Sequence, residues 1–516
     1  MTASATRMPV DERSDLAPAA RGGAANLAGS VVTGLVAFVL SVLVARFLSR
    51  SAAGVFFSTT SLFLLVTALG QLGGGTGVVY FIARARTLGA AGSIAGIVRT
   101  AHRPVLVFGV ATAVAGLVAA PWLAHVTLGS RSGSAAVCLR VLALFVPVVG
   151  IEAVWLAATR GFGSMRVNAA VELVGRPLAQ LALVALVLPT GRPGLIVLAW
   201  AAPYLVAAAL AGRAWSRRRA ALPTDGPPLP AGEFWRFTGP RALTGVVQLV
   251  MQRFDIVLVG ALAGAGAAAV YAAATRFVVV GQSVTGAFTQ AIQPMLGAAL
   301  AREDRVAAAD LYQLSTAWLV VLTWPVYLVL LVFRGTLLGV FGQGYGAGSA
   351  VLVWLALSML LAVGCGLVDV VLSMAGHPSW NLANSLLALA CNLGLDLWLI
   401  PGHGILGAAI GWAVAIAVRN LTALVQVALA LGLHPVARST LLAASIALTT
   451  FGAVPWTLRA WWGDHWWTLA VALVAGTALW ACALWAARRP LRLDAFRLPI
   501  LSDSRRRAGA EDGVGV

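Results

Sequence analysis

Ten charged side chains lie inside long apolar stretches of this 516-residue sequence, and these are the residues most able to do chemistry. They are five arginines and five carboxylates: Arg140, Arg176, Arg253, Arg276, Arg419, Glu152, Glu172, Asp255, Asp369 and Asp396. A charge within a bilayer is costly, so such residues face a helix bundle or a water-filled cavity, where they pair with one another or bind a ligand. Arginine offers a planar fork of donors that suits phosphate. A carboxylate can accept a proton or a small cation.

Amide side chains accompany these charges. One stripe on the eleventh apolar stretch has spacings of 3, 8 and 4 residues and comprises Asn381, Asn384, Asn392 and Asp396. It must face protein or water rather than lipid. On the seventh stretch Gln248, Gln252 and Asp255 share a face, from which Arg253 is turned by the helical rotation of about 100° per residue. We therefore expect Asp255 to face a cavity more directly than Arg253.

Two shorter patterns predict local structure. Glu172 and Arg176 are four residues apart, so they share a helix face and are expected to form an ion pair. The segment Gly70–Gly77 contains two GxxxG spacings, which are typical of close helix packing. The same glycines would also permit a bend or an unwound turn that changes shape during transport. Both interpretations of this segment remain open from the sequence.

The elements that must position these residues are about fourteen apolar stretches, each near the roughly 20 residues that cross a bilayer. A composition of 60% hydrophobic and 10% charged residues, with a mean hydropathy of +0.89, is typical of an all-α polytopic membrane protein. The expected spans are Ala24–Leu48, Gly54–Ala83, Pro104–Ala124, Ala135–Thr159, Val167–Leu188, Leu195–Trp215, Leu243–Leu262, Ala267–Leu300, Leu311–Phe333, Val351–Ala375, Ser379–Ile400, Ile405–Leu431, Thr440–Thr457 and Trp467–Ala487.

Arginine is distributed unequally between the two sides of these spans. With a cytoplasmic N-terminus, 25 arginines fall in cytoplasmic loops and tails, and six fall on the other side: Arg46, Arg50, Arg131, Arg192, Arg334 and Arg459. This asymmetry follows the positive-inside rule and predicts that both termini are cytoplasmic. The formal net charge of +18 therefore belongs to loops that flank the membrane. Anionic headgroups, rather than nucleic acid, are the expected partners of these loops.

Several kinds of chemistry are not expected. All 36 basic residues are arginine, so a phosphate-binding P-loop lysine and a Schiff-base lysine are excluded. The four cysteines and six histidines are scattered, and their spacing predicts no metal site and no disulfide framework. We expect no cofactor, no metal, no catalytic residue and no enzymatic activity.

An internal repeat organises the chain. Val42–Leu65 aligns without gaps on Val257–Val280 at an offset of 215 residues, and each segment joins the first two spans of a six-span unit. Two six-helix lobes related by a parallel pseudo-two-fold repeat are expected, followed by two extra helices. The predicted divisions are an N-terminal tail (1–23), an N-lobe (24–216), a cytoplasmic linker (217–240), a C-lobe (241–431), spans 13 and 14 (432–487), and an arginine-rich cytoplasmic tail (488–516). At the end of the linker, Glu233–Phe237 has the composition of an interfacial elbow.

Two stretches resemble a known family. Val44-Ala45-Arg46-Phe47-Leu48 with Gly54-Val55-Phe56, and Phe254 to Gly260 with Val270 to Arg276, are similar to the joins between spans one and two and between spans seven and eight of polysaccharide flippases. These flippases belong to the multidrug/oligosaccharidyl-lipid/polysaccharide (MOP) transporter superfamily. With fourteen spans and two lobes, the resemblance covers nearly the whole chain.

The resemblance implies a flippase that moves a polyprenyl-pyrophosphate-linked oligosaccharide to the outer leaflet of a bacterial plasma membrane by alternating access. Arg276 matches the motif and is the first candidate for binding pyrophosphate. The other substrate-binding candidates are Arg253, Gln252, Asn384 and Asn392, and the candidates for a coupling H+ or Na+ are Asp255, Asp369 and Asp396. Membrane lipids, a polysaccharide polymerase and glycosyltransferases are the implied partners.

The resemblance also leaves an alternative. The first span has no basic residue before Arg46, unlike related lipid II flippases, which argues against a peptidoglycan precursor as substrate. A cation-coupled multidrug antiporter of the same superfamily is the other function to consider. It requires a carboxylate in the N-lobe cavity, for which Glu152 and Glu172 are the candidates.

The arginine distribution predicts which loops and tails are cytoplasmic, and this prediction can be tested by labelling. Single cysteines placed in the linker between Arg217 and Pro230, or after Arg488, should not react with an impermeant maleimide added to intact cells. They should react after the cells are opened. Labelling of either segment from outside would overturn the predicted orientation.

Overall fold

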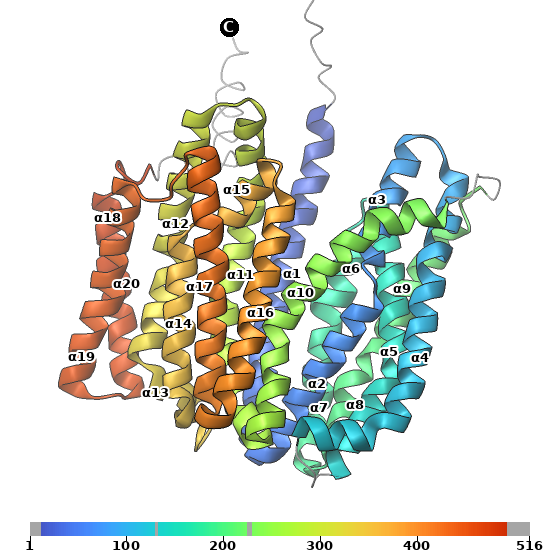
Figure 1. The fold of residues 1–516 in the computed structure, drawn as a ribbon, viewed down its shortest axis with the longest axis horizontal. Helices are drawn as coiled ribbons and strands as arrows, with labels where there is room; N and C mark the ends of the chain where they lie inside the picture. The colour runs from blue at the N-terminus through green and yellow to red at the C-terminus, as the bar shows by residue number, and fades with distance from the viewer. Residues whose placement is uncertain (1–11, 129–132, 224–229, 493–516) are drawn as a thin grey trace, which may run out of the picture. The chain divides into compact units, whose positions relative to one another are not determined.

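The computed structural model describes residues 12–128, 133–223 and 230–492, and within them every regular element is a helix (Figure 1). Fourteen helical segments are long and apolar enough to cross a membrane. Each overlaps one of the expected spans, and Ile405–Leu431 has the same bounds. Other ends differ by up to 13 residues, as in Ala91–Thr127, where the expected span begins at Pro104. The predicted all-α polytopic class is therefore confirmed. Arg131, residues 1–11 of the predicted N-terminal tail and residues 493–516 of the predicted C-terminal tail lie outside the described residues.

These apolar stretches fold as helices because a bilayer offers no hydrogen-bond partner to the backbone, and a helix satisfies its own amides and carbonyls. The chain divides into two compact units. Unit 1 comprises Met1–Ser283, Leu338–Val351 and Ser385–Ala415. Unit 2 comprises Val284–Leu337, Leu352–Asn384 and Ile416–Val516. The lobe boundaries expected from the sequence remain predictions.

The helices follow one another with short connections. Those that begin in unit 1 are α1 (Glu12–Phe47), α2 (Arg50–Gly70), α3 (Gly74–Thr87), α4 (Ile94–Leu128), α5 (Gly133–Gly161), α6 (Arg166–Asn168), α7 (Arg176–Val187), α8 (Pro193–Ala201), α9 (Pro203–Arg219), α10 (Ala231–Ala263), α11 (Ala265–Ala301), α14 (Ser349–Gly364) and α17 (Ile405–Leu431). Those that begin in unit 2 are α12 (Arg305–Val332), α13 (Arg334–Gly339), α15 (Val368–Met374), α16 (Pro378–His403), α18 (Arg438–Ala447), α19 (Val454–Trp462) and α20 (Trp466–Ala486).

The second span is interrupted in the glycine-rich segment. Helix α2 ends at Gly70 and α3 begins at Gly74, while Leu72 and Gly73 adopt φ values of 49° and 67°. This left-handed conformation costs glycine little, because glycine has no Cβ. At Gly73 a Cβ would also lie 2.7 Å from the Cβ of Ala242 on α10. The bend is therefore confirmed, and so is the close helix packing, since a Cβ at Gly70 or Gly77 would also lie within 3 Å of a neighbouring side chain. Movement of this segment during transport remains a prediction.

The fifth span contains a π-helix, which sequence patterns did not predict. It runs from Ala169 to Gly175 between α6 and α7. The Thr33 hydroxyl of α1 donates a 2.6 Å hydrogen bond to the Leu173 carbonyl within it. Single π turns are rare and concentrate at functional sites. Here the π-helix holds Glu172 immediately before Arg176 of α7.

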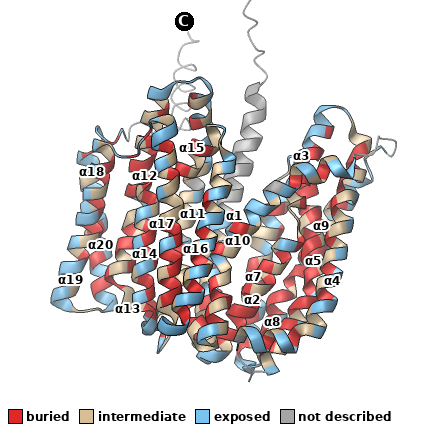
Figure 2. Cartoon of the chain, in the orientation of Figure 1, coloured by how far each residue is buried: buried red, intermediate tan, exposed pale blue. Residues whose placement is uncertain are grey.

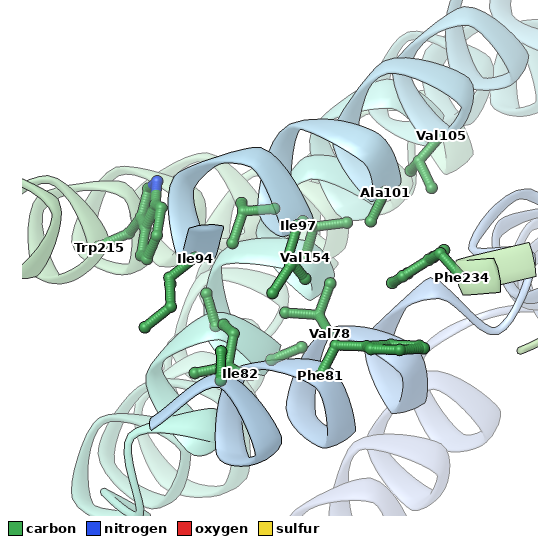
Figure 3. Close-up of a cluster of buried hydrophobic side chains, with 14 residues drawn as sticks. Val78, Phe81, Ile82, Ile94, Ile97, Ala101, Val105, Val154, Trp215 and Phe234 are labelled. Carbon is green, nitrogen blue, oxygen red and sulfur yellow. The ribbon is translucent and has the colours of Figure 1, made fainter. Parts of the chain in front are cut away.

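A hydrophobic cluster joins α3, α4, α5, α9 and α10 (Figure 3). Phe234 is fully buried there, with its ring centroid 5.5 Å from that of Phe81. Phe234 of the expected interfacial elbow Glu233–Phe237 thus packs into a protein core, and the place of this elbow at the membrane interface remains a prediction. Moreover, α9 continues to Arg219 and α10 begins at Ala231, so the predicted 217–240 linker is largely helical at its ends. Residues 224–229 lie outside the described residues.

Burial follows the packed helix faces throughout each unit (Figure 2). Both segments of the internal repeat form a helix, a tight turn and a helix. Helix α1 ends at Phe47 before α2 begins at Arg50, and α10 ends at Ala263 before α11 begins at Ala265. The two turns pack closely, because a Cβ at Gly54 would lie 1.7 Å from the Ala265 carbonyl oxygen.

The packing of α3 on α10 generates a prediction. A Cβ at Gly77 would lie 2.3 Å from the Thr238 hydroxyl and 2.8 Å from the Phe234 ring. Gly77→Ala should therefore destabilise the protein by about 1–3 kcal/mol. Gly96→Ala in α4 is the matched control, since its Cβ meets open space and alanine favours a helix. The melting temperature in detergent should fall for the first variant only, and an unchanged Gly77→Ala protein would contradict the close packing.

Candidate functional site

Unit 1 encloses a cavity of about 490 Å³. Side chains from α1, α2, α5, the π-helix, α7, α8, α9, α10 and α11 line it. Its charged lining residues are Glu152, Glu172, Arg160, Arg176, Arg253 and Arg276. Four arginines thus face two carboxylates, and the cavity has an excess of positive charge.

One arginine of the cavity is already neutralised. Arg176 forms two hydrogen bonds with Glu172, at 2.5 and 3.2 Å, which confirms the predicted ion pair. The Arg176 guanidinium also donates to the Tyr204 hydroxyl at 2.9 Å. Because breaking a buried pair leaves an uncompensated charge, this pair fixes α7 against α9 rather than offering a free binding group.

Two other arginines have no such partner. Among the described residues, neither Arg253 nor Arg276 forms an ion pair with a carboxylate. They lie close enough to repel each other electrostatically. The Arg276 guanidinium lies 5.7 Å from the centre of the Phe57 ring, and its buried Nε has no hydrogen-bond partner. Two guanidinium groups without a carboxylate partner in one cavity can bind an anion, and the planar fork of each matches phosphate oxygens.

The structure reverses the expected roles of neighbouring residues on α10. Arg253 lines the cavity, whereas Asp255 does not, and Gln252 is exposed outside it. The reason is that the helices packed around α10 supply hydrogen-bond partners for Asp255 on the side away from the cavity. Asp255 is turned towards Tyr271 of α11 and Asn392 of α16, which leaves the cavity face to Arg253.

Asp255 belongs to a second site in unit 1, a buried carboxylate cluster formed with Asp396, Asn392 and Tyr271. The Asn392 amide donates to Asp255 at 3.2 Å and to Asp396 at 2.7 Å, and the Tyr271 hydroxyl donates to Asp255 at 3.0 Å. Asp396 is fully buried. Gly411 makes room for it, since a Cβ there would lie 2.4 Å from an Asp396 carboxylate oxygen. Two carboxylates that share one amide can hold a proton or a small cation between them.

The remaining candidates lie in unit 2 and are engaged in pairs. The Asp369 carboxylate forms an ion pair with Arg419, and its backbone carbonyl accepts a 2.6 Å hydrogen bond from Asn381. Asn384 and Gln426 exchange two hydrogen bonds of 2.7 and 3.1 Å. The polar stripe on α16 thus faces protein partners, as expected. The charge of Asp369 is thus neutralised by Arg419, and the amide of Asn384 is hydrogen-bonded to Gln426.

Arg160 is not among the candidates from the sequence, because it lies one residue beyond the expected span Ala135–Thr159. It lines the cavity from the last turn of α5, and its buried Nε has no hydrogen-bond partner. Its place directly after that span was the available signal. Gln71 also lines the cavity, directly after the end of α2.

Comparison with known proteins identifies the family. The profile described as "Polysaccharide biosynthesis protein" matches residues 19–300. The chain belongs to this polysaccharide biosynthesis protein family. A second profile, MatE, matches residues 240–398 of the same chain. The chain is thus a member of the MOP superfamily of transporters and flippases, as its sequence motifs indicated. No curated protein sequence is significantly similar to it.

Solved structures share the fold of this family member. The lipid II flippase MurJ in an inward closed conformation has a TM-score of 0.68 at 10% identity, covering 90% of this chain and 98% of that one. An inward-facing multidrug resistance MATE transporter has a TM-score of 0.63 at 16% identity, covering 78% and 95%. A MOP superfamily transporter from Pyrococcus furiosus has a TM-score of 0.55 at 18% identity, covering 80% and 95%.

Proposed function

We propose that this protein is a flippase that moves a polyprenyl-pyrophosphate-linked oligosaccharide from the cytoplasmic to the outer leaflet of the plasma membrane. The observation that carries the proposal is the pair of unpaired arginines, Arg253 and Arg276, in the unit 1 cavity. Membership of the polysaccharide biosynthesis protein family supports a glycan as the cargo. Glycosyltransferases and a polysaccharide polymerase would then act before and after this step.

The arginine pair would bind the pyrophosphate. Each guanidinium can donate two parallel hydrogen bonds to phosphate oxygens, and the anion would relieve the repulsion between the two cations. Arg160 supplies a third cation at the same cavity. A volume of about 490 Å³ is typical of a small-ligand pocket, and it would hold a headgroup while the polyprenyl chain remains in lipid.

The membrane potential would favour this direction of transport. An anionic pyrophosphate that leaves an inside-negative cell gains about 2.3 kcal/mol per charge for every 100 mV it crosses. An ion gradient would then be needed chiefly to return the empty protein to its inward-open state. The first span, Ala24–Leu48, has no basic residue before Arg46, and this absence favours a glycan other than a peptidoglycan precursor.

Arg276→Ala should abolish export, because one half of the pyrophosphate site is lost. Arg276→Lys should retain part of the activity, since lysine keeps the charge but not the planar fork. The measurement is accumulation of unflipped lipid-linked glycan on the cytoplasmic leaflet of cells. Arg140→Gln is the matched control, because Arg140 is exposed and does not line the cavity. Normal export by a well-expressed Arg276→Ala variant would remove this residue from the mechanism.

The buried carboxylate cluster of Asp255, Asn392 and Asp396 is the proposed site of the coupling ion, either H+ or Na+. Asp255→Asn and Asp396→Asn keep the side-chain shapes but remove charge. Both should make export independent of the applied pH or sodium gradient. Asp369→Asn breaks the ion pair with Arg419 and should lower stability without changing ion dependence. Unchanged gradient dependence in both cluster variants would place the coupling site elsewhere.

A cation-coupled multidrug antiporter is the second candidate function, and Glu152 is the observation that favours it. Glu152 lines the cavity, is only 2% exposed, and has one carboxylate oxygen without a hydrogen-bond partner. A buried carboxylate of this kind could bind a cationic drug. Loss of drug resistance in Glu152→Gln cells with normal glycan export would favour the antiporter over the flippase.

A further inference from the structure

A second pocket of about 680 Å³ lies in unit 1 where α1 meets α2. It is open to the surface and is separate from the residues of the cavity described above. Arg46 and Arg50 line one side, and the segment from Gly339 to Tyr345 lines the other. Both arginines are exposed, and no acidic residue is among those that line the pocket.

The position of Arg50 is electrostatically unfavourable without a ligand. Arg50 is the first residue of α2, where the helix dipole is positive, and the first turn of α2 contains no acidic residue. Among the described residues, no hydrogen bond or ion pair involves the Arg50 side chain. Arg46, by contrast, lies in the last turn of α1, where a cation is stabilised. In the repeat, the residue equivalent to Arg50 is Ala265, so the turn itself does not require a cation.

The segment from Gly339 to Tyr345, which forms the opposite wall of the pocket, lies close to the Arg50 side chain. Gly344 has a φ of 85°, and a Cβ there would lie 3.0 Å from the Arg50 guanidinium carbon. Arg46 holds this wall by donating a 2.6 Å hydrogen bond from Nε to the Val340 carbonyl. Among the described residues this is the one hydrogen bond found for the Arg46 side chain. The absence of a side chain at Gly344 therefore leaves space for the Arg50 guanidinium, and both arginines line the pocket.

An unpartnered hydroxyl at the base of the pocket points to a ligand. Tyr345 lines the pocket, is 1% exposed, and its buried hydroxyl has no hydrogen-bond partner. This hydroxyl lies within electrostatic range of Arg50. A buried hydroxyl without a partner is costly, and an anion held by Arg50 would accept its hydrogen bond.

We propose that Arg46, Arg50 and Tyr345 form a binding site for a phosphate-bearing lipid headgroup. The site lies at the ends of spans opposite the arginine-rich loops, on the side where the positive-inside rule disfavours arginine, so topology does not account for these cations. Membrane phospholipid and the exported pyrophosphate-linked lipid share the required phosphate chemistry. The site stands independently of the proposed flippase function.

The test is titration of purified, delipidated protein with inorganic pyrophosphate at constant ionic strength, following the melting temperature. A triple variant, Arg160→Gln/Arg253→Gln/Arg276→Gln, serves as the background, since it removes the three arginines of the first cavity that have no carboxylate partner. Adding Arg50→Gln should weaken the pyrophosphate-dependent stabilisation about 10-fold or more in apparent affinity, and adding Tyr345→Phe about 5-fold. Arg192→Gln is the matched control, because Arg192 is an exposed arginine of the same predicted side that does not line the pocket.

Without pyrophosphate, Arg50→Gln should melt no earlier than its parent, since it removes a cation from the positive end of α2. A lower melting temperature in this condition would make Arg50 a structural residue and overturn the proposal. Equal pyrophosphate stabilisation with and without Arg50, or none in either protein, would also overturn it.

Two further arms identify the source of the phosphate. The melting temperatures of the unchanged protein and of its Arg50→Gln variant are measured in nanodiscs of phosphatidylglycerol and in nanodiscs of phosphatidylcholine. If phospholipid is the occupant, Arg50→Gln should lose the extra stabilisation by phosphatidylglycerol while export continues at the normal rate. If the exported lipid is the occupant, Arg50→Gln should slow export and respond equally to both nanodiscs. A variant with normal export and an unchanged response to phosphatidylglycerol would exclude both sources.

Discussion

Every charge inside the bilayer needs a partner, and this constraint organises the interior of the protein. Glu172 is held by Arg176, and Asp369 is held by Arg419. Asp255 and Asp396 share the amide of Asn392. Because so many intramembrane charges are satisfied in this way, the few that are not become informative. Arg253 and Arg276 are such exceptions, and both line one cavity.

The same constraint applies to the backbone, and each interruption of a span has its own solution. Gly73 turns the chain between α2 and α3 without a Cβ to clash with α10. In unit 2, the break between α14 and α15 is supported by the Tyr312 hydroxyl, which donates a 2.6 Å hydrogen bond to the Cys365 carbonyl. Irregular backbone at membrane depth is tolerated where protein supplies such partners. Transporters commonly use interrupted helices near their binding sites.

The number and order of the spans could be predicted because each apolar stretch is close to the thickness of a bilayer. Their lengths could not, because helices such as Ala91–Thr127 continue beyond the apolar stretch into polar sequence. The Glu172–Arg176 pair could also be predicted, since residues four apart meet on any helix. The orientation of Arg253 and Asp255 could not, because it depends on which helices surround α10 rather than on α10 itself. Arg160 was missed for a related reason. A residue at the end of an apolar stretch can lie in a loop or line a cavity. Which of the two holds for Arg160 depends on how α5 packs against its neighbours.

The π-helix at Ala169–Gly175 has a consequence for how relatives of this protein should be aligned. A π turn arises when one extra residue is accommodated within an α-helix. In a relative that lacks the extra residue, the helix after this point would be rotated by about 100° about its axis compared with the helix in this protein. A gap-free alignment would then match Arg176 with a residue that points at lipid or at another helix. Comparisons of cavity chemistry within the family therefore need a one-residue gap in this span, placed by geometry rather than by residue identity.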